Sequence, residues 1–138
     1  MIRHNIYTYP SADTGSGETF RLNTLLASPH SEMVAPGFAL GVVTMEPGHG
    51  HDIHAHPQNR EICVVLEGEL HLYQKRGGDI LVEKESDGVL LKQGDFFSMD
   101  FDEPHGFWNK GDKTARMLWI YHPAGNAEDR FLNKRTAD

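Results

Sequence analysis

The stretch PGHGHDIHAHPQNRE, residues 47–61, holds four of the nine histidines of the chain and decides how the rest of the sequence is interpreted. His54 and His56 are two positions apart, so both imidazoles project from the same face of an extended backbone. Pro57 disfavours a central position in a sheet, and the polar residues after it suit a turn. Glu61 then begins the next strand. The spacing predicts two adjacent antiparallel strands that direct two imidazoles and one carboxylate into one space.

A second polar cluster lies downstream in GDFFSMDFDEPHGFWN, residues 94–109. A strand in this segment can present His105 to the space that the first cluster shares. Three neutral imidazoles and a carboxylate suit Fe(II), Mn(II), Ni(II), Zn(II) or Cu(II), and they do not suit an all-oxygen calcium cage. The competing interpretation is a solvated polar loop that binds no metal, because histidine-rich loops also occur by chance.

Short runs rich in β-branched and aromatic residues alternate with Gly, Pro and Asp turn signals along the chain. Many short strands divided by turns are typical of a β-sandwich or β-barrel. The runs predicted as strands are 38–45, 61–66, 70–73, 80–82, 89–91, 96–99 and 117–121. Only residues 127–134 have a pattern compatible with a helix, and that helix is short. The predicted fold class is therefore all-β, with a short C-terminal helix.

Length and charge narrow the class of protein further. A chain of 138 residues fits one domain, residues 1–138. Lys and Arg number 13 against 20 Asp and Glu, and the formal charge of −7 argues against a nucleic-acid partner. No apolar run approaches the roughly 20 residues of a membrane helix. The single Cys63 excludes an intramolecular disulfide. We therefore expect a cytoplasmic protein with neither a membrane nor a nucleic-acid partner.

The spacing within both clusters resembles the two motifs of the cupin superfamily. The first motif runs Gly48, five residues, His54, one residue, His56, four residues, Glu61, six residues, Gly68. The second runs Gly94, five residues, Asp100, one residue, Asp102, two residues, His105, three residues, Asn109. The family usually has Pro and Gly at the positions of Asp100 and Asp102, so the turn before His105 departs from the pattern. The core motifs are thus 48–68 and 94–109.

The resemblance implies a double-stranded antiparallel β-helix, which is a jelly-roll barrel with a metal inside. One divalent transition metal (Fe, Mn, Ni, Zn or Cu) would have four ligands, His54, His56, Glu61 and His105. About two positions would stay open for water, substrate or dioxygen.

Further residues are expected to line a substrate pocket. Cys63 and Val65 share the strand face of Glu61, and Phe107 shares that of His105. Arg60 is the candidate that would bind an anionic substrate at the barrel mouth. The competing interpretation is core packing for the apolar side chains and a solvated charge for Arg60.

Cupin barrels host dioxygenases, isomerases, lyases, decarboxylases and non-catalytic sensors, so the motifs identify a site and not a reaction. One hypothesis is a metal-dependent enzyme for a small oxygenated substrate, with the metal as Lewis acid and Glu61 as the ligand able to act as a base. The other is a non-catalytic module that binds a small ligand or a metal, which tight binding without turnover would reveal. Barrels of this family often dimerise, so a homodimer is expected.

Overall fold

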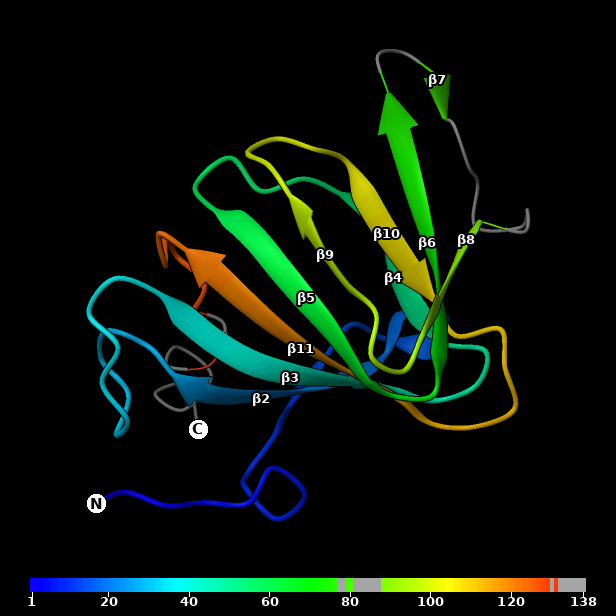
Figure 1. Cartoon of the computed structure of the whole chain (residues 1–138). Helices are drawn as coiled ribbons and strands as arrows, with labels where there is room; N and C mark the ends of the chain where they lie inside the picture. The colour runs from blue at the N-terminus through cyan, green and yellow to red at the C-terminus, as the bar shows by residue number, and fades with distance from the viewer. Residues whose placement is uncertain (77–78, 81–87, 130, 132–138) are drawn as a thin grey trace.

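Two antiparallel sheets enclose the core of the protein (Figure 1). The computed structural model describes residues 1–76, 79–80, 88–129 and 131. One sheet has six strands in the order β1-β2-β3-β11-β5-β9. The other has the order β4-β10-β6-β7, and β8 also pairs with β6. Within the described part of the chain, no helix has the length and apolar character needed to cross a bilayer.

The strand bounds follow from the turn signals on either side. The six-stranded sheet contains β1 (Ala12–Thr14), β2 (Arg21–Ala27), β3 (Ala39–Met45), β11 (Ala115–His122), β5 (Arg60–Glu67) and β9 (Phe96–Met99). The five-stranded sheet contains β4 (Gly50–His54), β10 (His105–Trp108), β6 (Glu69–Arg76), β7 (Asp79–Ile80) and β8 (Val89–Lys92). One turn of 3-10 helix, η1 (Gly17–Thr19), precedes β2.

The all-β class and the jelly-roll architecture predicted from the sequence are confirmed. Strands β1 and β2 were not predicted, because their segment follows a polar, Gly- and Ser-containing start. Half of the predicted helix 127–134 lies outside the described residues, as does part of the predicted strand 80–82. The single domain over residues 1–138 stays a prediction.

Alternation along β11 shows how the core is built. Its odd-numbered positions from Ala115 to Tyr121 are buried, while the even-numbered ones are more exposed. Burial of such side chains contributes roughly 1.5–3 kcal/mol for each large apolar residue. Trp119 packs against Gly41 on β3, where an added Cβ would lie 2.2 Å from the indole ring. This close approach explains a glycine in the middle of a core strand.

The strands on either side of the first motif lie in different sheets. β4 and β5 do not pair as the sequence analysis expected, because they belong to different sheets. Residues 55–59 cross from one sheet to the other, and β4 pairs with β10 instead. The first motif therefore spans the gap between the sheets.

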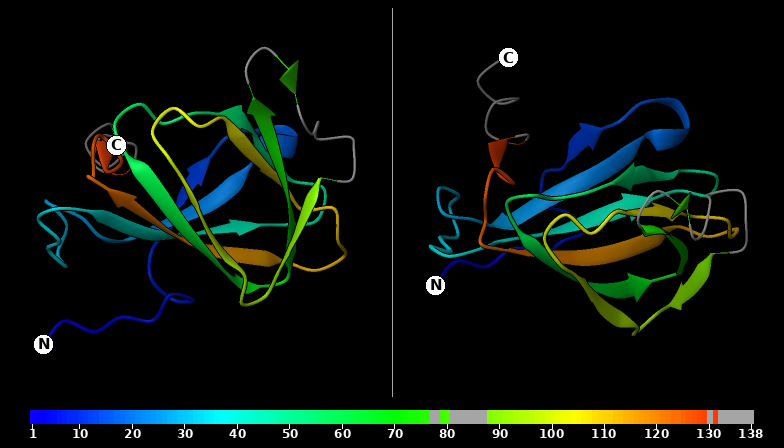
Figure 2. Two further views of the ribbon diagram at one scale, coloured as in Figure 1. Left: turned by 45° about the horizontal axis from the view of Figure 1, so that its top comes forward. Right: turned by 90° about the horizontal axis from the view of Figure 1, so that it is seen from above.

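After β11 the chain turns across the ends of the strands, toward the end of β2 (Figure 2). Ala124, Ala127 and Phe131 are buried in the core cluster. The Glu128 carboxylate accepts hydrogen bonds from the hydroxyl of Ser28 and the backbone N–H of His30. These contacts fix the C-terminal segment to the connection after β2.

Candidate metal centre

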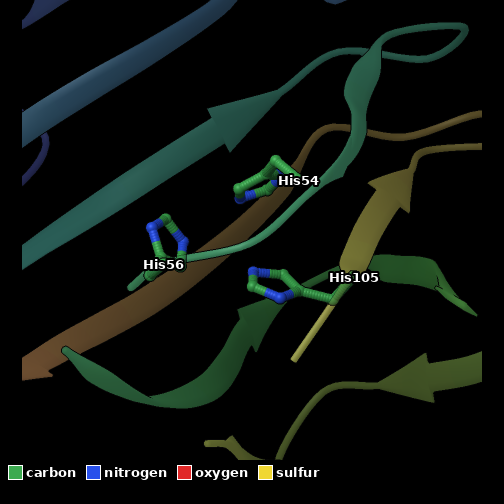
Figure 3. A group of neighbouring side chains, drawn as sticks. All are labelled: His54, His56 and His105. Carbon is green, nitrogen blue, oxygen red and sulfur yellow. The ribbon is translucent and has the colours of Figure 1, made fainter. Parts of the chain in front are cut away.

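Four side chains of the two motifs converge in the interior from different elements. His54 is the last residue of β4, and His105 is the first of β10. The register pairs these two residues directly, which sets their ring centroids 4.4 Å apart. His56 lies in the connection beyond β4, and Glu61 is the second residue of β5. Figure 3 shows the three imidazoles turned toward one another.

The distances within this group are those of donors around a common point. One ligand atom of each of the three histidines lies within 4.8 Å of the others. The Glu61 Oε2 atom is 3.3 Å from His56 Nε2 and 3.2 Å from His105 Nε2. Glu61 is 4% exposed and His105 is 1% exposed.

Among the described residues, no hydrogen-bond partner of acceptable geometry is found for Glu61 Oε2, His56 Nε2 or His105 Nε2. Buried polar atoms without partners are costly, and a cation at the centre of such a convergent set would satisfy all of them. The residues therefore fit a metal ion.

Backbone carbonyls orient two of the imidazoles. The Nδ1–H of His54 donates to the Asp52 carbonyl oxygen at 2.8 Å. The Nδ1–H of His105 donates to the Glu103 carbonyl oxygen, also at 2.8 Å. A carbonyl can only accept, so the proton sits on Nδ1 and Nε2 keeps a lone pair for a metal. The tautomers of both rings are thus set before any ion binds.

Burial and mutual proximity set the protonation of the site. Burial, and after it the neighbouring His105, lower the pKa of His54 to about 4. Burial alone would raise the pKa of Glu61, but His105 and His56 outweigh that effect and hold it below its usual range. At neutral pH the site contains a neutral His54 and an ionised Glu61, which are the protonation states of metal ligands.

The sequence model of the cupin domain family matches residues 41–121, more than half of the chain. The chain belongs to the cupin family. This cupin is also 30% identical over 102 residues to a protein named polyketide synthase CurC from Streptomyces cyaneus. The matched region covers 74% of this chain and 58% of that relative.

Solved structures show the same fold at low sequence identity. A predicted oxalate decarboxylase from Thermotoga maritima superposes with a TM-score of 0.70, covering 88% of this cupin and 99% of that chain at 18% identity. A double-stranded β-helix protein from Klebsiella pneumoniae covers 91% of both chains, with a TM-score of 0.65 and 22% identity. Oxalate oxidase in complex with glycolate gives a TM-score of 0.67 at 19% identity, over 88% of this chain and 59% of that one.

A cavity of about 20 Å³ is lined in part by His54 and Glu61 of this cupin. Such a volume holds about one water molecule. Its lining consists of Arg21, Asn23, Val43, Met45, His51, His54, Glu61, Phe107, Met117, Trp119 and Tyr121. A larger groove of about 490 Å³ lies beside the turn at Gly68 and the 109–114 loop, and it contains none of the four converging residues.

Of the four residues expected to line a pocket, the structure places one at this cavity and three elsewhere. Phe107 lines the cavity, whereas Cys63 and Val65 are buried outside its lining. Arg60 extends over the surface, where its Nε–H donates to Asp100 Oδ1 at 2.8 Å. Its guanidinium also lies over the Phe101 ring, 4.7 Å from the centroid. The hydrogen bond from Arg60 lowers the pKa of Asp100.

Sequence reasoning missed the cavity wall formed by β2 and β11. Arg21 is a cation with only 7% exposure, and its guanidinium donates to the Thr19 carbonyl oxygen at 2.6 Å. Trp119 Nε1–H donates to Asn23 Oδ1 at 3.2 Å, which orients both side chains. The Tyr121 ring lies 5.0 Å from the His56 ring. The alternation of RLNTLLA at residues 21–27 was the available signal, because it places Arg21 and Asn23 on one face.

Proposed function

We propose that this cupin is a mononuclear metal-dependent enzyme that acts on a small oxygenated substrate. The observation that carries the proposal is the convergence of three buried, unpartnered atoms on His56, Glu61 and His105, with His54 beside them. The four side chains would hold one divalent transition metal. When bound, the metal would supply Lewis-acid chemistry toward an oxygen atom of the substrate.

The donor set restricts the metal. Imidazole nitrogen with one carboxylate oxygen favours Fe, Mn, Ni, Zn or Cu, and it disfavours the all-oxygen shell that calcium takes. The preset tautomers of His54 and His105 support this assignment, because each ring presents its Nε2 lone pair to the site.

The remaining chemistry belongs to the residues of the chain. Glu61 is ionised and is the one carboxylate among the proposed ligands, so it is the group that can accept a proton from a bound substrate. Arg21 contributes a permanent positive charge to the same cavity wall. A cation beside a metal site favours a substrate that carries negative charge. The small cavity favours a compact substrate.

The reaction class is proposed as one of the dioxygenase, isomerase, lyase or decarboxylase types. Structural relatives of this fold include proteins named oxalate oxidase, DMSP lyase and KdgF, as well as the predicted oxalate decarboxylase. Their names support a small oxygenated substrate. They do not select one reaction, because similar barrels support different reactions.

One observation favours a second candidate function, a non-catalytic module that binds a metal or small ligand. The cavity next to the proposed ligands has room for about one water molecule, which leaves little space for a substrate without side-chain movement. Under this alternative the same four residues bind the ion, and no turnover occurs.

Metal analysis of the purified protein, followed by substrate screens with and without oxygen, tests the two functions. Turnover that requires oxygen selects dioxygenase chemistry, and oxygen-independent turnover selects isomerase, lyase or decarboxylase chemistry. A stoichiometric metal with no turnover across small hydroxy acids, keto acids, phenols and sugar acids supports the binding module. Protein that takes up no metal under any of these conditions contradicts both.

We also propose that the protein forms a homodimer through the outer face of the six-stranded sheet. The register places Leu118, Val64 and Phe96 in one row across β11, β5 and β9, next to Val42 of β3, which is already buried within the chain. Phe96 is 78% exposed, and the neighbouring outer residue Ile62 is 46% exposed. The side chains of this row are uncharged, which limits repulsion between two chains of charge −7. The cytoplasmic location stays a prediction.

A further inference from the structure

The Glu61 carboxylate has a second oxygen that faces away from the histidines. Oε2 points to His56 and His105, whereas Oε1 accepts a hydrogen bond from the Cys63 thiol at 3.4 Å. Cys63 is fully buried, and it lies two positions along β5 on the same face. Within the described structure, Cys63 is the donor to Oε1, the oxygen that faces away from the imidazoles.

A carboxylate on a flexible side chain can present either oxygen, or both, to a metal. A donor fixed on one oxygen removes that freedom, because rotating the carboxylate would break the hydrogen bond inside a buried site. Groups that hold ligands in this way commonly change metal affinity by about 10–100-fold when they are removed. The sulfur is held in place because Cys63 pairs with Trp119 on β11 and with Phe97 on β9.

We propose that Cys63 is a positioning residue, whose thiol proton holds Glu61 Oε1 so that Oε2 alone faces the metal site. The inference rests on the proposed function, since it assigns a role within the same metal site. It differs from the pocket role expected from the sequence, because Cys63 lies outside the cavity lining. Under this proposal the Cys63 sulfur is not a metal ligand, because the thiol keeps its proton and donates it in the hydrogen bond to Glu61 Oε1.

The first arm of the test needs no metal. Cys63 is the single cysteine of the chain, so the S–H stretching band in the Raman spectrum belongs to this residue alone. We expect the band of the chelator-treated wild type to lie at lower frequency than that of Glu61→Gln, because an amide oxygen is a weaker acceptor than a carboxylate. An identical band in both proteins would overturn the hydrogen bond and the proposal with it.

The second arm measures cobalt(II) affinity by chelator competition, together with the cobalt absorption spectrum. Cys63→Ala removes the donor and is expected to weaken cobalt binding about tenfold and to alter the spectrum. Cys63→Ser keeps a hydroxyl donor and is expected to restore most of the affinity and the spectral shape. Val65→Ala is the matched control, because Val65 is the next inward residue of β5 with similar burial and no polar contact to Glu61.

The two arms separate this proposal from the metal site itself. Wild-type protein that binds neither cobalt nor any of the proposed metals would contradict the proposed function, and the Raman arm would still decide whether Cys63 holds Glu61. Wild-type cobalt binding with an unchanged Cys63→Ala variant would overturn the positioning role alone. Equal losses in Cys63→Ala and Val65→Ala would overturn it too, because they would trace the effect to core packing.

Discussion

The backbone N–H of Asp102 donates to the carbonyl oxygen of His56 at 2.9 Å. This bond joins the turn before His105 to the segment between the sheets, so the two sequence motifs hold each other in place. Asp102 adopts a φ of 57°, in the left-handed region where glycine is favoured. It occupies the position where the family usually has Gly, and the structure shows why: the turn needs that conformation, and Asp tolerates it better than most residues.

The turn conformation predicts opposite outcomes for two substitutions. Asp102→Val should destabilise the protein by about 1–2 kcal/mol, because a β-branched residue is strained in the left-handed region. Asp102→Gly should leave the stability close to that of the wild type, since glycine adopts this conformation freely. Denaturant unfolding of both variants measures the difference. A Val variant as stable as the Gly variant would contradict the strain argument.

Removal of one imidazole should deplete the metal without unfolding the barrel. We expect His56→Ala to lower bound metal by at least about tenfold, since the ligand is lost while the core strands stay intact. Metal analysis and circular dichroism measure the two effects, and His122→Ala on the exposed end of β11 serves as the control. Full metal content in His56→Ala would remove His56 from the site, and an unfolded variant would show that the metal is structural.

Glu61→Gln separates metal binding from turnover. The amide preserves the size of the side chain and offers a neutral oxygen donor, but it cannot carry the negative charge or take up a proton. We expect the variant to retain part of its metal and to lose turnover on any substrate that the screens identify. Activity equal to that of the wild type would remove Glu61 from the mechanism.

The pKa of His54 predicts an acid-dependent loss of stability in the metal-free protein. The folded value of about 4 lies below the ordinary 6.5, so the unfolded chain binds an extra proton between these values. Stability therefore falls as the pH drops from 6.5 to 4, by at most about 3 kcal/mol from this group. The lowered pKa of Glu61 adds a loss of the same sign in more acidic solution.

Denaturant unfolding in excess chelator across this pH range measures that loss. His54→Gln should flatten the dependence, whereas His122→Gln at the surface should not. Excess metal should move the acid transition to lower pH, because metal binds the folded form and competes with protons for the ligands. Identical unfolding in chelator and in metal from pH 5 to 8 would contradict the four-residue site.

The proposed dimer depends on the apolar row that ends in Phe96. Phe96→Asp places a charge on that face, and we expect it to convert the dimer to a monomer because burying an unpaired carboxylate is costly. Val89→Asp on β8 of the other sheet is the matched control and should leave the dimer intact. Sedimentation velocity measures the mass of each variant. A monomeric wild type would contradict the proposal.

Local patterns were enough to predict the all-β class and the convergence of the four motif residues. Alternation indicates which face of β5 is buried, and the spacing of His54 and His56 indicates a shared direction. The pairing of β4 with β10 could not be predicted this way, because neither strand has an apolar pattern that specifies its neighbour. The same holds for Arg21, which enters the cavity from a strand distant in sequence.

The ion-pair partner of Arg60 also lay beyond the sequence pattern. Arg60 and Asp100 are 40 residues apart, and their ion pair depends on how β5 and the turn after β9 are stacked. A charged residue next to a metal ligand alternates to the other face of its strand, so adjacency in sequence implies separation in space. The same rule places Cys63 beside Glu61.

The proposed ligands come from both sheets, with His54 and His105 on one, Glu61 on the other and His56 in the segment that crosses between them. An ion bound by all four residues would link the two sheets of the barrel to each other. Separation of the two sheets to admit a large substrate would move Glu61 away from the imidazoles and release the ion. Substrate entry and metal retention would thus oppose each other in this fold. A substrate would have to reach the metal without separating the two sheets.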